Sequence, residues 1–274
     1  MSRAVVTVRW PGAVVATSAA LLLFLLTAAV LPGLLAPGNP LAIAPLEAFQ
    51  PPSAAHLLGT DESGRDLYTR IIHGAGPSLL IGAFATVIGL GLGGVLGAIA
   101  GLGPHWVDAG TTRFVEVLFA FPGLLLALLF IVIAGPGPLT STVAVGLATA
   151  PGYARLVRTQ VLAVRRSAYV ESAIVLGRGW WRRLVRHIAP NVGGTLFVLV
   201  TLGIGQSIVW ASALSYLGLG VSPPAAEWGA MLSAGRTYVG SFWWLTFFPG
   251  LAIVLSAAST TLLGRHLQQR TRSS

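Results

Sequence analysis

Five long stretches of the chain contain no charged side chain. They run from Pro11 to Leu46, Ile71 to Val107, Val117 to Ala154, Ile188 to Ala226 and Thr237 to Gly264. Because an arginine or aspartate in the middle of a membrane costs about 2.5 to 3.5 kcal/mol, charge-free stretches of this length predict membrane-spanning helices. A helix needs about 20 residues to cross the hydrocarbon, so the third stretch, interrupted by the sequence GPGP at 135–138, predicts two spans.

The pattern therefore predicts an all-α, polytopic membrane protein of about six transmembrane helices. We expect the spans near residues 12–34, 78–102, 115–134, 139–160, 192–218 and 243–264. The first apolar run is about twice as long as the hydrophobic region of a signal peptide, so it predicts a retained anchor. We expect residues 1–55 to form this anchor and the start of an external segment, and residues 56–274 to form one core domain.

Composition agrees with a membrane protein and excludes several kinds of site. Hydrophobic residues make up 54% of the chain and charged residues 9%, against about 25% charged in a soluble domain. All 17 basic residues are arginine, and a Walker-type phosphate loop needs a lysine, so this chain cannot hold such an ATP site. Cysteine is absent, which excludes disulfides and thiolate ligands, and the five histidines lack i, i+4 spacing. No metal site is expected.

The arginines predict the orientation of the chain. Fourteen fall on one side of a six-span arrangement, and only Arg65, Arg70 and Arg236 fall on the other. Five of the eight acids share that second side, namely Glu47, Asp61, Glu62, Asp66 and Glu227. Because basic residues concentrate in cytoplasmic loops, we expect both termini and the connection 161–190 to be cytoplasmic.

This cytoplasmic connection predicts two short helices. Apolar positions recur at helical spacing from Tyr169 to Leu176, Gly177 is a natural C-terminal stop, and a run of mixed arginine and apolar positions continues to Pro190. A rigid loop of this size favours contact with another protein. Two alternatives remain open for its arginines, which are enforcing topology and contacting anionic lipid, whereas nucleic-acid binding is not expected.

Small and polar residues inside the spans suggest further roles. In the second span, glycines recur every fourth residue, a pattern that lets another helix approach closely; they are Gly89, Gly93, Gly97 and Gly101. The same run matches G-x-G-x-x-G, but no strand precedes it, so dinucleotide binding is not expected. In the fifth span, polar residues that could line a pathway, or equally pack against other helices, are Gln206, Ser207, Ser212 and Ser215.

The outer connection before the second span carries a polar motif, GTDESGRD, at residues 59–66. Ser63 and Asp66 have capping-box spacing, and Leu67 begins an apolar face, so the segment predicts an interfacial helix. No acidic or basic residue lies at the centre of any span, which argues against an ion-coupled carrier.

Two of these segments resemble a known family. Glu171, Ser172 and Ala173, followed by Gly177 and Pro190, resemble the EAA loop of binding-protein-dependent ABC importer permeases, although Ser172 stands where alanine is usual. The motif at 59–66 is similar to the GTDxxGRD signature of the dipeptide, oligopeptide and nickel branch of that family. Segments 151–155 and 215–220 look like further family sequences.

The resemblance implies a type I ABC importer permease fold and a role as a permease subunit, not an enzyme, in the bacterial inner membrane. It implies ATP-driven import of peptides, nickel or related small solutes by alternating access. The implied partners are a homologous second permease subunit, two cytoplasmic ATPases that bind ATP and Mg²⁺, an external solute-binding receptor and the lipid bilayer. No cofactor is expected in this chain. A passive channel or an ion-driven carrier is the alternative.

The resemblance also implies which residues transmit force. The helix around the EAA segment docks on an ATPase in that family, so the expected coupling residues are Tyr169, Val170, Glu171, Ser172, Ala173, Gly177 and Pro190. Cargo stays open, because the family's specificity is implied to rest largely on the receptor.

Overall fold

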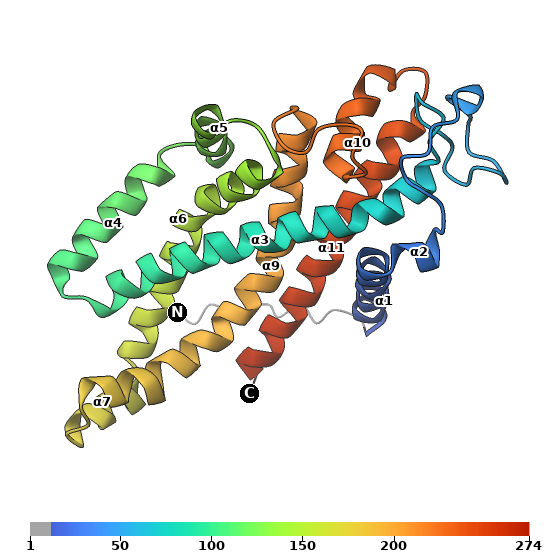
Figure 1. The fold of residues 1–274 in the computed structure, drawn as a ribbon. Coiled ribbons are helices and arrows are strands. Elements are labelled where there is room, and N and C mark those ends of the chain that lie inside the picture. The colour runs from blue at the N-terminus through green and yellow to red at the C-terminus, as the bar shows by residue number, and fades with distance from the viewer. Residues whose placement is uncertain (1–11, 274) are drawn as a thin grey trace.

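The computed structural model describes residues 12–273, with side chains for 12–269, and within this range every regular element is helical. Long helices run between the two ends of the molecule and cross one another obliquely, as Figure 1 shows. The predicted all-α class is therefore confirmed. Arg3 and Arg9, which contribute to the predicted orientation, lie outside the described residues.

Four helices of the described chain are long and apolar enough to cross a membrane. These are α1 (Gly12–Val30), α3 (Leu67–Leu102), the continuous run from Trp180 to Tyr216, and α11 (Trp244–Ser273). The run from Trp180 comprises α8 (Trp180–Arg183), the π-helical turn η2 (Leu184–Ile188) and α9 (Ala189–Tyr216).

The span predicted over 115–134 is not one continuous helix. Two helices occupy this region, α4 (His105–Phe119) and α5 (Gly123–Ala134), and they are bent by 86° relative to each other. The break falls just before Pro122, and the residue that precedes a proline is disfavoured in the α conformation. Hydropathy could not reveal the bend, because the two helices together are apolar enough for one span. Together they make at most one broken span.

The predicted span over 139–160 lies in α6 (Pro138–Arg165), which is 28 residues long but is not among the strongly apolar helices. Helices α3, α5 and α9 surround it, and thirteen of its side chains are buried. A helix enclosed by protein does not need an apolar face toward lipid. The sixth span thus stays a prediction.

The predicted capping box and separate interfacial helix are also wrong. Asp66 is itself the N-cap of α3, since its Oδ2 accepts a hydrogen bond from the Thr69 N–H at 2.8 Å. From Leu67 the helix continues through Pro77 for 36 residues without a break. Asp61 stabilises the turn of the motif at 59–66 instead, because its Oδ1 accepts hydrogen bonds from the Ser63 and Arg65 N–H groups.

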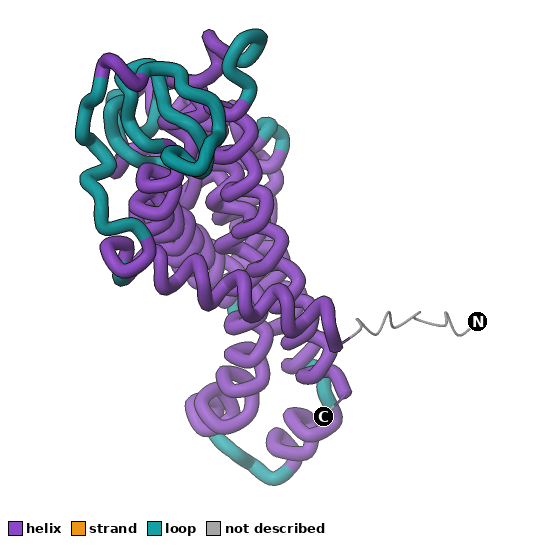
Figure 2. The backbone as a smooth tube through the Cα atoms, turned by 90° about the vertical axis from the view of Figure 1, so that its right-hand side faces the viewer, coloured by secondary structure: helices purple, strands orange, loops and turns teal. Residues whose placement is uncertain are grey.

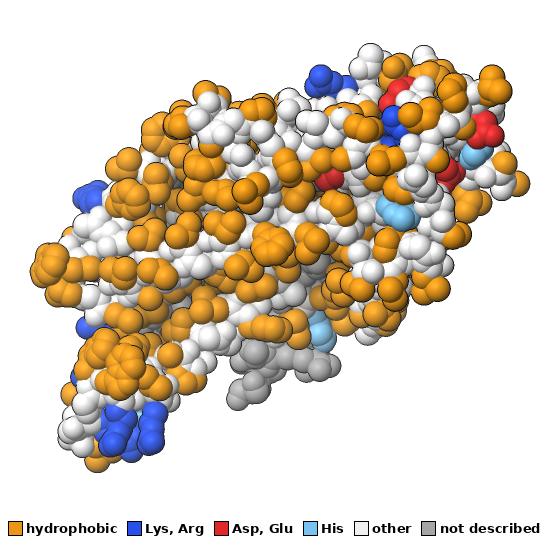
Figure 3. Space-filling model, in the orientation of Figure 1, with side chains coloured by type: hydrophobic (Ala, Val, Ile, Leu, Met, Phe, Trp, Pro, Cys, Tyr) orange, Lys and Arg blue, Asp and Glu red, His pale blue; other side chains and the backbone are white. Residues whose placement is uncertain are grey.

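The two ends of the molecule differ in structure and charge. One end carries the outer connections and α10 (Trp228–Gly235), and the other carries α7 (Ala168–Val175) on a narrow tip (Figure 1). Loops gather at these ends, while the middle is helical (Figure 2). Carboxylates gather at the end with α10 and a group of arginines at the tip (Figure 3). The remaining short elements are α2 (Pro32–Leu35), η1 (Pro45–Glu47) and η3 (Arg236–Tyr238).

Candidate functional site

A defined C-terminal cap ends α7 at the tip. The Gly177 N–H donates to the Ile174 carbonyl at 2.9 Å, and the Arg178 N–H donates to the Ala173 carbonyl at 3.0 Å. Gly177 has a φ of +70°, in the left-handed region that favours glycine. These are the two bonds of a Schellman motif, so the helix stop predicted at Gly177 is confirmed.

One face of α7 anchors it to the body of the protein. Val170 and Ala173 are buried, and Val170 joins an apolar cluster with Val164 of α6 and with Ile188 and Val192 of the run that leads into α9. The tip is therefore held by both helices that flank it, and a force on α7 acts on both of them.

Exposed apolar side chains follow at the end of α7 and at the start of α8. Val175 is 88% exposed and Leu176 71%, and Ile174, Trp180 and Trp181 are also exposed. Clustered apolar side chains of this kind mark a surface for another protein or for lipid. The exposed side chains of Glu171 and Ser172 lie beside them, and the Ser172 hydroxyl donates to the Ala168 carbonyl at 2.8 Å.

Aromatic and polar contacts join the two halves of the tip. The Tyr169 ring lies 6.0 Å from the His187 ring, centroid to centroid, and an Arg178 Nη1 lies 3.2 Å from His187 Nε2. Pro190 lies farther along, in the first turn of α9 and directly after the π-helical turn. Because proline has no N–H, the helical ladder lacks a donor at that point. The expected coupling residues thus divide into a group at 169–177 and Pro190 beyond η2.

The predicted glycine stripe faces α6 along the whole length of their contact. A Cβ built at Gly89, Gly93, Gly97 or Gly101 would approach atoms of α6 to less than 3.0 Å. The neighbouring Gly94, in contrast, has nothing within 4 Å of such a Cβ. The backbones of α3 and α6 are therefore in direct contact over this stripe.

Three of the four predicted pathway residues are buried within this chain. Ser207 is fully buried, with its hydroxyl 3.0 Å from that of Thr86, and the Ser215 hydroxyl accepts from the Val221 N–H at 3.3 Å. Ser212 is buried against Gly229 of α10. These positions are typical of helix packing.

Only Gln206 of that set is exposed. It lines a cavity of about 270 Å³ between the end of α4, the turn to α5, α6 and α9, together with aromatic side chains that include Tyr153 and Trp210. Of the four candidates, it alone remains suited to line a pathway.

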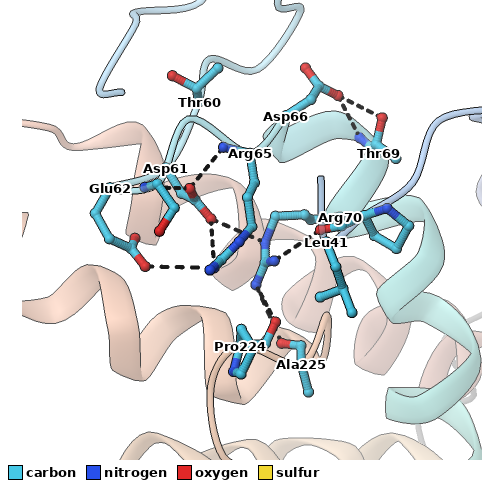
Figure 4. Close-up of polar contacts among 12 residues, drawn as sticks. Leu41, Thr60, Asp61, Glu62, Arg65, Asp66, Thr69, Arg70, Pro224 and Ala225 are labelled. Atoms are coloured by element: carbon cyan, nitrogen blue, oxygen red, sulfur yellow. Dashed lines mark hydrogen bonds and ion pairs between the residues drawn. The ribbon is translucent and has the colours of Figure 1, made fainter. Parts of the chain in front are cut away.

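A buried arginine organises the outer end, as Figure 4 shows. Arg70 donates to the Pro40 carbonyl at 3.0 Å and to the Pro224 carbonyl at 3.1 Å, and its Nε lies 3.5 Å from Asp61 Oδ2. Asp61 also lies 3.4 Å from Arg65. One guanidinium thus joins the segment after α2, the motif and the loop before α10. In the sequence, Arg70 served only as a marker of topology.

Glu227 is a second residue whose structural role the sequence did not reveal. Its buried carboxylate caps α10 by accepting from the Gly229 and Ala230 N–H groups at 2.9 and 2.8 Å. The Ser78 hydroxyl of α3 also donates to it, at 3.3 Å. Burial raises the pKa of this carboxyl, and the backbone hydrogen bonds oppose that rise. The partner Ser78 is distant in sequence, so no local pattern pointed to this contact.

No group of three or more potential metal ligands occurs among the residues that the structure describes. The geometry provides an exposed apolar tip, close helix packing and cavities.

Comparisons with known proteins agree with this geometry. The family model described as "Binding-protein-dependent transport system inner membrane component" matches residues 93–273. The chain is 42% identical to the glutathione transport system permease protein GsiD of Pectobacterium atrosepticum, over 79% of this chain and 72% of that one. It is 41% identical to the di/tripeptide transport system permease protein DppC of Pseudomonas aeruginosa, over 78% and 71%.

A solved structure shares the fold. A chain of the MetNI methionine ABC transporter, in an inward-facing conformation, superposes with a TM-score of 0.55 and 18% identity, covering 74% of this chain and 95% of that one. At this identity the likeness concerns the fold alone, and it confirms the expected fold.

Proposed function

This chain belongs to the binding-protein-dependent transport system inner membrane components, in the peptide branch of ABC importer permeases, and on that premise we propose that it couples ATP-driven motion of partner ATPases to solute import. The proposed cargo is peptides or related small solutes, nickel complexes included. The observation that carries the proposal is the set of exposed apolar side chains on the capped tip at 174–181.

The tip suits docking because its shape is fixed before a partner arrives. The Schellman cap holds the end of α7, and the buried Val170 and Ala173 anchor one of its faces. Docking would cover Val175 and Leu176, and burial of such side chains is worth about 1.5 to 3 kcal/mol each. The arginines of the tip would orient the partner through complementary charge.

Transport then follows from alternating access. A homologous second permease subunit pairs with this chain, and two cytoplasmic ATPases bind ATP and Mg²⁺ and grip the two tips. Their closure draws the tips together and biases the spans toward an outward-open state, which accepts cargo from an external receptor. This chain transmits the motion and breaks no bond, consistent with its lack of the lysine that an ATP-binding loop requires.

The proposed location is the bacterial inner membrane, with the tip and both termini in the cytoplasm. Carboxylates at one end and arginines at the other support this orientation (Figure 3). The domain division expected from the sequence, with an anchor in 1–55 and a core in 56–274, is part of the same proposal.

The direct test is copurification of an ATPase subunit with a variant of the tip. The double substitution Val175→Glu and Leu176→Glu replaces two exposed apolar side chains of the tip with charged ones. It should abolish copurification, because docking would then bury two carboxylates without partners. Leu46→Glu is the matched control, since Leu46 is 98% exposed and lies on the outer side of the proposed orientation. Undiminished ATPase binding by the tip variant would remove the proposal. Solute transport by the purified chain alone in liposomes would favour a channel or an ion-driven carrier.

A further inference from the structure

A two-bond ion pair joins α4 to α6 on the side of the molecule that bears the tip. Arg158 donates from Nε to Asp108 Oδ1 at 2.5 Å and from Nη2 to Oδ2 at 2.7 Å. Thr112 also donates to Asp108 Oδ1, at 3.2 Å. The two charged side chains are 30% and 22% exposed. Bidentate pairs of this kind combine strength with a fixed orientation, so this contact can set the position of α4.

Packing alone holds α4 weakly. Of its 15 residues only Val115 is buried, whereas Trp106 is 75% exposed and Phe114 and Val117 are also open. A cavity of about 230 Å³ separates α4 from α3 and α6, and Arg158 is among the residues that line it. With so little buried contact, the ion pair carries a large share of the connection between α4 and α6.

Arg158 itself belongs to the most tightly packed part of the molecule. A Cβ built at Gly97 of α3 would lie 2.9 Å from the Arg158 backbone nitrogen. Arg158 precedes the end of α6 at Arg165 by seven residues, about two helical turns, and α7 begins three residues after that end. Two turns of continuous helix and a two-residue connection therefore link Arg158 to the tip.

The bend that follows α4 is suited to act as a hinge. The 86° bend separates α4 from α5, and the second cavity, of about 270 Å³, is lined by the end of α4, the turn to Gly123 of α5, α6 and α9. Segments with few buried contacts and free space beside them are those that move most readily. Helix α4 and the bend after it have these properties, whereas α5, with Ala127 and Ile131 buried, and the α3–α6 pair do not.

We propose that Arg158 and Asp108 are positioning residues that carry a displacement of the tip from α6 to α4, so that α4 moves with the tip about the bend that joins it to α5. This inference rests on the proposed function, because it concerns how the motion of the ATPases reaches the helices around the cavities. It assigns a role in coupling to two residues outside the tip.

The experiment uses the whole transporter reconstituted in liposomes, with uptake and ATP hydrolysis measured together. Arg158→Gln and Asp108→Asn should each lower uptake per ATP hydrolysed by about tenfold, the factor that corresponds to about 1.4 kcal/mol of lost coupling. Copurification of the ATPases should be unchanged. Arg113→Gln is the matched control, since it removes the exposed pair that Arg113 makes with Glu116 within α4, at 2.9 Å.

A covalent replacement for the ion pair supplies the second measurement. Because the chain has no cysteine, Asp108→Cys with Arg158→Cys creates a unique pair. A short bifunctional thiol reagent should restore the uptake that the double variant has lost. Uptake by the single variants within about twofold of the unmodified transporter, or no recovery on tethering, would overturn the inference. Uptake by the unmodified complex that does not depend on ATP would instead overturn the proposed function.

Discussion

Replacing Gly177 by alanine should weaken ATPase docking through backbone strain alone. The φ of +70° at Gly177 is unfavourable for any residue with a Cβ, at a cost of about 1 to 2 kcal/mol. The space around it is open, with nothing within 4 Å of a built Cβ, so no steric clash adds to the cost. The chain would relieve the strain by releasing the cap, which frees the last turn of α7. Docking would require the cap again, so the strain would appear in the binding free energy.

A cost of 1 to 2 kcal/mol corresponds to binding that is weaker by up to about 5- to 30-fold. Gly177→Asn should lose less, because asparagine enters the left-handed region more easily than alanine. Gly179→Ala is the control, since Gly179 has a φ of −59° and equally open surroundings. The assay is titration of the purified ATPase onto the chain in detergent. Equal affinities for Gly177→Ala and Gly179→Ala would refute the reasoning, because the two variants add the same methyl group.

Three further substitutions test other parts of the structure. Gly93→Ala should destabilise the detergent-solubilised chain by about 1 to 3 kcal/mol through overpacking against α6, whereas Gly94→Ala should leave its stability unchanged. Thermal denaturation measures both variants, and equal midpoints would contradict the close packing of α3 against α6. Arg70→Gln should lower the free energy of unfolding by about 2 to 3 kcal/mol, because buried acceptors on three segments lose a charged donor. An unchanged midpoint of thermal denaturation would show that this arginine does not hold the outer end together. In intact cells, a membrane-impermeant thiol reagent should label Leu46→Cys and leave Val175→Cys unlabelled; the reverse pattern would exclude the proposed orientation.

The sequence predicted those parts of the fold that depend on an energetic cost set by the residue and its immediate neighbours in the chain. A charge inside hydrocarbon is expensive wherever it occurs, so charge-free stretches locate the spans: the last predicted span begins at 243 and α11 at Trp244. Gly177 marked the end of α7 for a similar reason, because a left-handed cap favours glycine whatever its surroundings. Such signals need no knowledge of distant contacts.

Features that depend on distant partners could not be predicted in this way. The second span was predicted to begin near 78, yet α3 begins at Leu67, and there Arg70 and His73 find carbonyl partners at Pro40, Pro224 and Ala36. The three buried serines of α9 look the same in sequence whether they line a pathway or pack against α3 and α10. The bend before α5 is likewise invisible to hydropathy, since α4 and α5 together are apolar enough for one span.

The distribution of tight and loose packing in this chain suits a subunit that transmits force. A coupling element can work only if its displacement is not absorbed locally, and α6 meets this condition because the glycine stripe of α3 lies against it. A gating element must move without disrupting the core, and α4 meets that condition because only Val115 is buried. Neither property alone produces transport, since a rigid lever needs a connection to the part that moves. Arg158 and Asp108 supply that connection, and we therefore expect their loss to separate ATP hydrolysis from uptake while the assembled complex persists.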